Sequence, residues 1–294
     1  MTPRLPLMTA VLLAVACGGG SPRPGTAPTP TPAPPALPGV APSHSPTVQF
    51  APSTTHFLVR QDLHIQQDYA GLPPTIDLRY GLFVTAAIGA PVDSGLPTTF
   101  TIDSIVVDSA TQLPPQINLA AARGYRITGR LLSTGEFISG PCDTSAAAAG
   151  INTLLPRFRS FFPRLPVGGV RPAMTWSDSA DVTDNPTCSG GSSITTHAAN
   201  QRTAAAWEDH AGSRALRLES TSNYRFNGSG QQSGNPFTIA GSGAGTGIAY
   251  MSPDGRYLGG EQRDSATLTI DLQVQGITIP RRQLSHTVVT ALPR

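Results

Sequence analysis

The sequence contains no lysine, and it is poor in charged and aromatic residues. All 20 basic residues are arginine, 18 residues are acidic, and charged residues make up 13% of the chain. The arginines are scattered along the chain, whereas a nucleic-acid partner calls for basic residues clustered on one face. The sequence also lacks a phosphate-binding lysine loop, a serine elbow motif and the ligand spacing of a zinc site. It therefore predicts no enzyme, no cofactor, no metal site and no nucleic-acid partner.

The N-terminus carries an apolar stretch that is too short to cross a bilayer as a helix. Arg4 precedes an apolar run over residues 5–16, and residues 13–17 are Leu-Ala-Val-Ala-Cys, followed by three glycines. This pattern resembles a bacterial lipoprotein signal peptide spanning residues 1–17, which implies that Cys17 carries a lipid such as palmitate. The resemblance implies an exported protein anchored in a membrane, at the outer membrane or the periplasmic face. Residues 14–16 also fit ordinary signal cleavage, which would give a secreted protein instead.

The chain after Cys17 divides by composition into a linker and a domain. Residues 18–48 are dominated by proline, threonine, alanine and glycine. Such a segment cannot bury a core, and it is predicted to be a disordered, extended linker. Residues 49–294 are predicted to form one domain, which the linker would hold away from the membrane surface.

Only two cysteines remain once Cys17 is lipidated. Cys142 and Cys188 are predicted to form a disulfide, because an even pair in an exported protein is more often bridged than free. Closing that loop would stabilise the fold by about 4 kcal/mol in the chain-entropy model. The alternative is two separate buried thiols.

Alternation of apolar and polar residues predicts long β-strands on both sides of the middle of the chain. Between Phe57 and Tyr69 the odd positions are mostly apolar and the even positions mostly polar, which is the period of a strand with one buried face. Similar patterns cover residues 76–88, 100–106, 125–129, 216–226 and 266–274. Turn residues separate them at 133–135, 210–213, 252–255 and 275–276. Short turns between half-buried strands favour antiparallel pairing.

One segment has helical rather than strand spacing. Apolar residues recur at Ile151, Leu154, Leu155, Phe158, Phe161 and Phe162. This stripe predicts an amphipathic helix from about Thr153 to Phe162, packed on the sheet. The alternative is a helix whose stripe faces a lipid or a partner.

The order of strands, helix and strands predicts an α+β fold, in which a large curved antiparallel sheet packs against a central amphipathic helix. Residues 162–167, Phe-Pro-Arg-Leu-Pro-Val, followed by Met174-Thr175-Trp176, look like a stretch shared by uncharacterised bacterial lipoproteins. The whole order resembles the LolA and LppX families of exported lipoproteins. The resemblance implies an apolar cavity for a lipid, but it assigns no ligand contacts. The predicted helix would supply the wall of such a cavity from its apolar stripe, with Leu154, Leu155, Phe158, Phe161 and Phe162.

Three hypotheses for the function follow. The first is a non-catalytic binding or carrier module for an apolar ligand, such as an apolar small molecule or lipid. The second is a structural or protein-interaction module of the cell envelope with no ligand cavity. The third is a hydrolase whose site is assembled across strands, which a convergent histidine and carboxylate cluster would reveal.

Three residue patterns look functional but have simpler explanations. The glycines between Gly241 and Gly247 are predicted to be a bent or closely packed strand, because a helix does not follow them. The carboxylates Asp178, Asp181 and Asp184 are predicted to lie in a solvated loop rather than a calcium site. His64 and Asp62 are predicted to share the exposed face of one strand.

Overall fold

The structure is a computed structural model that describes residues 47–69, 73–93, 95–108, 122–141, 158–184, 192–232 and 235–293. Within these residues the chain forms eleven strands and one short 3₁₀ turn. The strands are β1 (Ser53–Gln67), β2 (Thr75–Ile88), β3 (Leu96–Val107), β4 (Arg126–Leu131), β5 (Phe137–Ser139), β6 (Thr175–Thr183), β7 (Ser193–His210), β8 (Ser213–Gln232), β9 (Asn235–Met251), β10 (Tyr257–Leu272) and β11 (Ile277–Ala291). The 3₁₀ turn is η2 (Gln273–Gln275).

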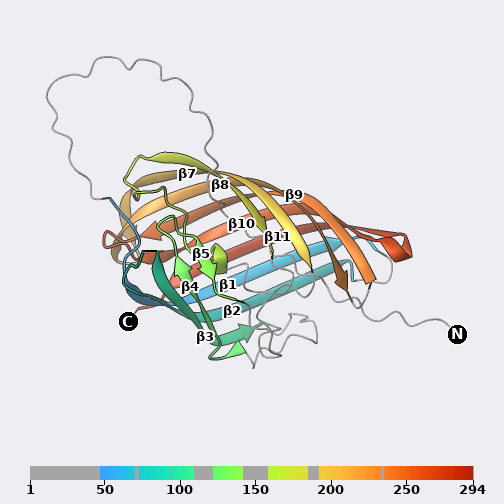
Figure 1. The fold of residues 1–294 in the computed structure, drawn as a ribbon, viewed down its shortest axis with the longest axis horizontal. Helices are drawn as coiled ribbons and strands as arrows, with labels where there is room; N and C mark the ends of the chain where they lie inside the picture. Colours follow the sequence, from blue (N-terminus) through green and yellow to red (C-terminus); the bar gives the residue numbers. More distant parts are fainter. Residues whose placement is uncertain are drawn as a thin grey trace, which may run out of the picture.

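All eleven strands belong to one antiparallel sheet. Its order is β5-β4-β3-β2-β1-β11-β10-β9-β8-β7-β6, so almost every strand pairs with its neighbours in sequence. The pairing of β1 with β11 is the exception, and it joins the two halves of the chain from Phe57–Ala291 to Gln67–Arg281. Figure 1 shows these strands side by side, with β3 toward the bottom of the view, β7 toward the top, and a pronounced bend in the long strands. The short strand β5 and the strand β6 are the two edges.

The predicted α+β class, with a central amphipathic helix, is wrong. The described part of the chain is β-structure, and around the predicted helix it has only a single turn at Phe158–Ser160, which the Phe161 amide closes on the Phe158 carbonyl at 3.2 Å. Residues 151–157 lie outside the described residues. Pro156 and Pro163 leave room for less than two helical turns between them, and so short a helix is marginal without neighbouring turns.

The individual strand and turn predictions fare better. The predicted strands at 57–69, 76–88, 100–106, 125–129, 216–226 and 266–274 overlap β1, β2, β3, β4, β8 and β10. Turns join β4 to β5, β7 to β8 and β9 to β10 where proline, glycine and serine predicted them, and η2 joins β10 to β11. The prediction that Val106 lies on the buried face with Phe100 is wrong. A bulge at Asp103 shifts the alternation of β3, so the Val106 side chain is 58% exposed.

One face of the sheet, called the inner face below, carries the buried side chains. Its largest core is an aromatic cluster in which the Phe100 ring lies 4.8–5.6 Å from the rings of Phe137, Phe158, Phe161 and Phe162. Phe57 and Tyr257 join the cluster from β1 and β10. Within the described residues, the three phenylalanines of the predicted stripe thus lie at a short turn and just after it, and their rings enter one cluster.

The segment 158–174 connects the two edges of the sheet by backbone hydrogen bonds. The Leu165 amide donates to the Thr134 carbonyl between β4 and β5 at 2.9 Å. At its other end the Ala173 amide donates to the Ala204 carbonyl of β7 at 2.7 Å. Val170 pairs with Val48 in an isolated antiparallel bridge. The segment is therefore fixed at both ends while its phenylalanines pack on the inner face.

The glycines of β9 are a strand, as predicted, and neighbouring side chains occupy the space beside them. A Cβ atom on Gly241 would overlap the Phe226 ring, and one on Gly243 would overlap the Tyr224 ring. A Cβ on Gly245 would overlap Asp264 Oδ1, and one on Gly247 would press on the Ser220 hydroxyl. The absence of side chains on one strand thus makes room for two rings and for two polar groups.

Candidate functional site

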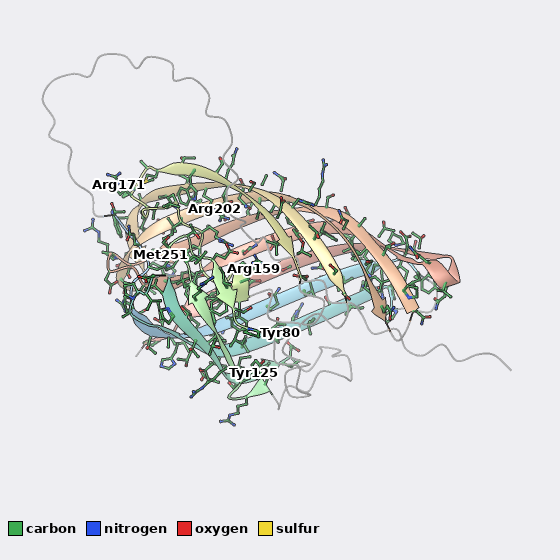
Figure 2. The ribbon with its side chains drawn as sticks, in the orientation of Figure 1. Tyr80, Tyr125, Arg159, Arg171, Arg202 and Met251 are labelled. Carbon is green, nitrogen blue, oxygen red and sulfur yellow. The ribbon has the colours of Figure 1, made fainter. Side chains whose placement is uncertain are left out.

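Two rows of polar side chains cross the inner face between apolar regions. One row follows the register from Gln61 through Thr287, Gln262, Gly247 and Ser220 to Arg202 and Trp176. The next row follows it from Ser285 through Asp264, Gly245, Ser222 and Asn200 to Asp178. We call their polar members the polar belt: Gln61, Asp178, Asn200, Arg202, Ser220, Ser222, Gln262, Asp264, Ser285 and Thr287. Figure 2 labels Arg202 of the first row and Tyr80, the partner of Gln61 on β2.

Apolar rows border the polar belt on both sides. Val59, Leu82 and Leu218 lie on the side of the aromatic cluster. On the other side lies a second buried core, which includes Tyr224, Phe226, Leu268 and Ile270. The belt is therefore a polar band inside an otherwise apolar inner face, a placement that costs free energy unless the groups are hydrogen-bonded.

The belt residues of β1 and β11 form hydrogen bonds with one another. Gln61 is buried, its amide nitrogen donates to the Ser285 hydroxyl at 3.1 Å, and its amide oxygen accepts from the Thr287 hydroxyl at 2.6 Å. These bonds join the two halves of the chain across the β1–β11 pairing. They account for this end of the belt without any further partner.

A cavity of about 180 Å³ lies between the belt and the segment 158–164. Its apolar wall is formed by Phe158, Phe161, Phe162, Tyr257 and Leu218, and its polar wall by the belt. Ligand pockets combine apolar walls with a few placed polar groups in this way, although those for drug-sized molecules measure 300–1,000 Å³. The cavity therefore suits a small molecule with an apolar and a polar side.

Two buried polar atoms of residues that line this cavity have no hydrogen-bond partner among the described residues. The Asn200 side chain is 2% exposed, and its nitrogen donates to Asp178 Oδ1 at 2.6 Å. Because a carboxylate accepts this bond, the Asn200 oxygen points away from Asp178, and this oxygen is one unpartnered atom. The other is the Trp176 indole nitrogen. Buried polar groups are normally paired, so these two atoms call for a water or a ligand.

Arginine–carboxylate pairs lie at one end of the cavity. Glu136 is buried and accepts from Arg159 at 2.9 Å and from Arg164 at 3.1 Å, while Asp178 accepts from Arg202 at 3.1 Å. Burial lowers the pKa of Arg164, and the neighbouring Glu136 carboxylate opposes that shift. Each arginine of the cavity, Arg164 and Arg202, therefore has its own carboxylate.

Asp264 differs from these paired charges. Burial raises the pKa of Asp264 to about 6, and the hydrogen bond from Gln262, at 3.2 Å, only partly opposes the shift. Among the described residues, no basic side chain forms an ion pair with it. Its register partners on β9 and β11 are Gly245 and Ser285, which carry no charge. The belt thus holds a carboxyl group without a cationic partner, and such groups concentrate at functional sites.

The structure describes three of the five residues that were predicted to form the ligand wall. Phe158, Phe161 and Phe162 line the cavity, while Leu154 and Leu155 lie outside the described residues. The same holds for Cys17 and for Cys142 and Cys188, so the lipid anchor and the disulfide stay predictions. The sequence patterns did not lead to a prediction of the polar belt. Its signal in the sequence is polar residues at the apolar phase of an alternating strand, such as Gln61 between Val59 and Leu63, or Ser220 and Ser222 between Leu218 and Tyr224.

The other candidate patterns do not form sites. His64 contacts Asp77 at 2.8 Å on the outer face of the sheet. Asp178 and Asp181 lie in β6 rather than in a loop and face opposite sides, since Asp181 pairs with His197. Within the described ranges, no group of three metal-ligating side chains gathers, and no helix is long and apolar enough to cross a membrane.

Comparison with known proteins assigns no family. The sequence matches no protein-family model and no curated protein. Among solved structures, the chain is similar to Pseudomonas aeruginosa OccK2 (OpdF), with 8% identity, coverage of 82% of this chain and 98% of that one, and a TM-score of 0.29. It is also similar to the COG4313 outer membrane channel of Pseudomonas putida F1, with 8% identity, coverage of 86% and 100%, and a TM-score of 0.21. Likeness at this level does not assign this chain a function.

Proposed function

We propose that the chain is an exported, membrane-anchored and non-catalytic binding module that holds a small amphipathic molecule in the cavity beside the polar belt. One observation carries the proposal: the cavity has an apolar and a polar wall, and two of the residues that line it, Asn200 and Trp176, each have a buried polar atom that lacks a partner among the described residues. A bound molecule would supply those hydrogen bonds. A buried donor or acceptor that is left without a hydrogen bond costs about 1–3 kcal/mol of folding free energy.

The proposed ligand differs from the purely apolar one that the sequence predicted. One wall of the cavity is polar, and a cavity of about 180 Å³ is small for an acyl chain. An acyl chain would also leave the Asn200 oxygen and the Trp176 N–H unpaired. A small molecule with one polar side fits both walls.

Native mass spectrometry of the protein extracted gently from its own host tests the proposal. We expect a non-covalent adduct of small mass that disappears on denaturation. Ser220→Phe should fill the cavity and remove the adduct, whereas Thr221→Phe places the same ring on the exposed face of β8 and should keep it. Wild-type protein with no adduct would contradict the proposal and favour a structural or interaction module.

The anchor is tested separately through Cys17. Cys17→Ser should move the protein from the membrane fraction to the soluble fraction, because the acceptor of the lipid is lost. Wild-type protein that is soluble and has no acyl mass on its first residue would show simple secretion instead.

A further inference from the structure

The cavity is lined both by an anionic group of the polar belt and by aromatic rings. Asp264 lines the cavity together with Asn200, whose unpartnered oxygen is a second acceptor. Phe158, Phe161 and Tyr257 line the same cavity. Carboxylates, amide oxygens and aromatic faces are the groups that attract ammonium ions in proteins.

We propose that this cavity binds an organic cation whose ammonium group lies against Asp264 and the Asn200 oxygen while its apolar part contacts the phenylalanine wall. The inference rests on the proposed binding function and names the chemical class of its ligand. An anionic ligand would be repelled by the Asp264 carboxylate. The two arginines of the cavity could not easily attract it, because they are already paired with Glu136 and Asp178.

The nearest neighbours of Asp264 across the sheet carry no charge. On β9 and β11 its register partners, Gly245 and Ser285, are uncharged, and on β8 and β7 Ser222 and Asn200 follow in the same row. Three other charged residues line the cavity: Arg202 on β7, which is paired with Asp178; Arg164, which is paired with Glu136; and Glu261 on β10, which is paired with Arg263 and His286. The charged residues beside Asp264 on the outer face, Arg263 and His286, contact Glu261 instead.

The geometry also gives the carboxylate a defined place. Gly245 leaves the space that Asp264 Oδ1 occupies, since a Cβ there would overlap this oxygen. The Gln262 amide donates to the same oxygen at 3.2 Å. The carboxylate is thereby held beside β9, and a cation that binds there replaces the missing countercharge.

Three probes that share a phenyl ring and differ in their end group test this inference. 2-Phenylethylamine is a cation at neutral pH, 2-phenylethanol is neutral and phenylacetate is an anion. In calorimetric titrations of the ligand-stripped full chain at pH 7.5, we expect the amine to bind at least tenfold more tightly than the alcohol, and phenylacetate to bind most weakly. Asp264→Asn should abolish the preference for the amine, whereas Asp271→Asn, on the same strand and bonded to Thr278 on the exposed side, should keep it.

The affinity for the amine should also fall several-fold as the pH drops from 7.5 to 5, because protonated Asp264 no longer offers a negative charge. Equal binding of amine and alcohol, or tighter binding of phenylacetate, would overturn the inference but leave the binding function intact. Binding of none of the three would also overturn it. The proposed function itself fails only if protein from the host carries no adduct.

Discussion

Asp264 keeps its carboxyl group in the polar belt at a cost in stability. Burial raises its pKa to about 6, so the folded state holds a proton more tightly than the unfolded chain, in which an aspartate titrates near 3.9. The folded state therefore loses stability as the pH rises from about 4 to about 6, and the loss is complete above that range. A residue that lowers stability in this way is typical of a site retained for binding.

Asp264→Asn should therefore raise the free energy of unfolding at pH 7 by about 1–3 kcal/mol, because the amide needs no charge in the belt. The gain should shrink as the pH falls and vanish near pH 4, where the carboxyl group of the wild type is protonated in both states. Urea denaturation of both proteins at a series of pH values measures it. A difference that stays constant from pH 7 to pH 4 would refute the assignment.

At the scale of the element, the glycines of β9 leave space that side chains of the neighbouring strands occupy. Its glycines face rings of β8 on one part of the strand and the polar belt on the next. An ordinary glycine-to-alanine change stabilises a protein by about 0.4–1 kcal/mol through the unfolded state. At these positions the added methyl group meets a neighbour instead.

Gly243→Ala should lower the free energy of unfolding by about 1–3 kcal/mol, because its Cβ overlaps the Tyr224 ring and the Ser265 carbonyl oxygen. Ser242→Ala, the next residue on the exposed face of the same strand, should change it by less than about 0.5 kcal/mol. Thermal or urea unfolding of both variants decides the matter. A stabilising Gly243→Ala would mean that the ring and the strand are not in close contact.

The elements that the sequence predicted well are those with local signals. Period-two alternation and turn residues give β1, β2, β8 and β10 and the turns between β4 and β5, β7 and β8, and β9 and β10. The spacing of Phe158, Phe161 and Phe162 misled because aromatic rings can enter one cluster from an irregular segment as well as from a helix. The polar belt escaped because it is defined across strands, by the pairing of residues as distant as Gln61 and Thr287. Polar residues at the apolar phase mark its members within each strand, but a single strand carries no signal for which of them the register brings together.

At the scale of the whole molecule, segment 158–174 connects the two edges of the sheet, and ion pairs lie at both edges. Glu136 precedes the edge strand β5 and binds Arg159 and Arg164 of this segment, and Asp178 of the edge strand β6 binds Arg202. Buried pairs add little net stability over apolar residues, but removing one partner leaves a buried charge uncompensated.

Glu136→Gln should therefore destabilise the fold by about 3–5 kcal/mol, since Arg164 is almost fully buried beside it. Glu261→Gln is the matched control, because its partner Arg263 is well exposed and surface pairs contribute at most about 1 kcal/mol. Chemical denaturation compares the two losses. Equal small effects would show that the Glu136 pair does not hold the segment in place.

A crystal structure of the protein purified from its own host would show whether the cavity beside the polar belt holds a small molecule. We expect electron density for a non-protein molecule between the phenylalanine wall and the belt, within hydrogen-bond distance of the Asn200 oxygen and the Asp264 carboxylate. A cavity that contains only ordered water, or one filled by the protein's own side chains, would contradict this expectation.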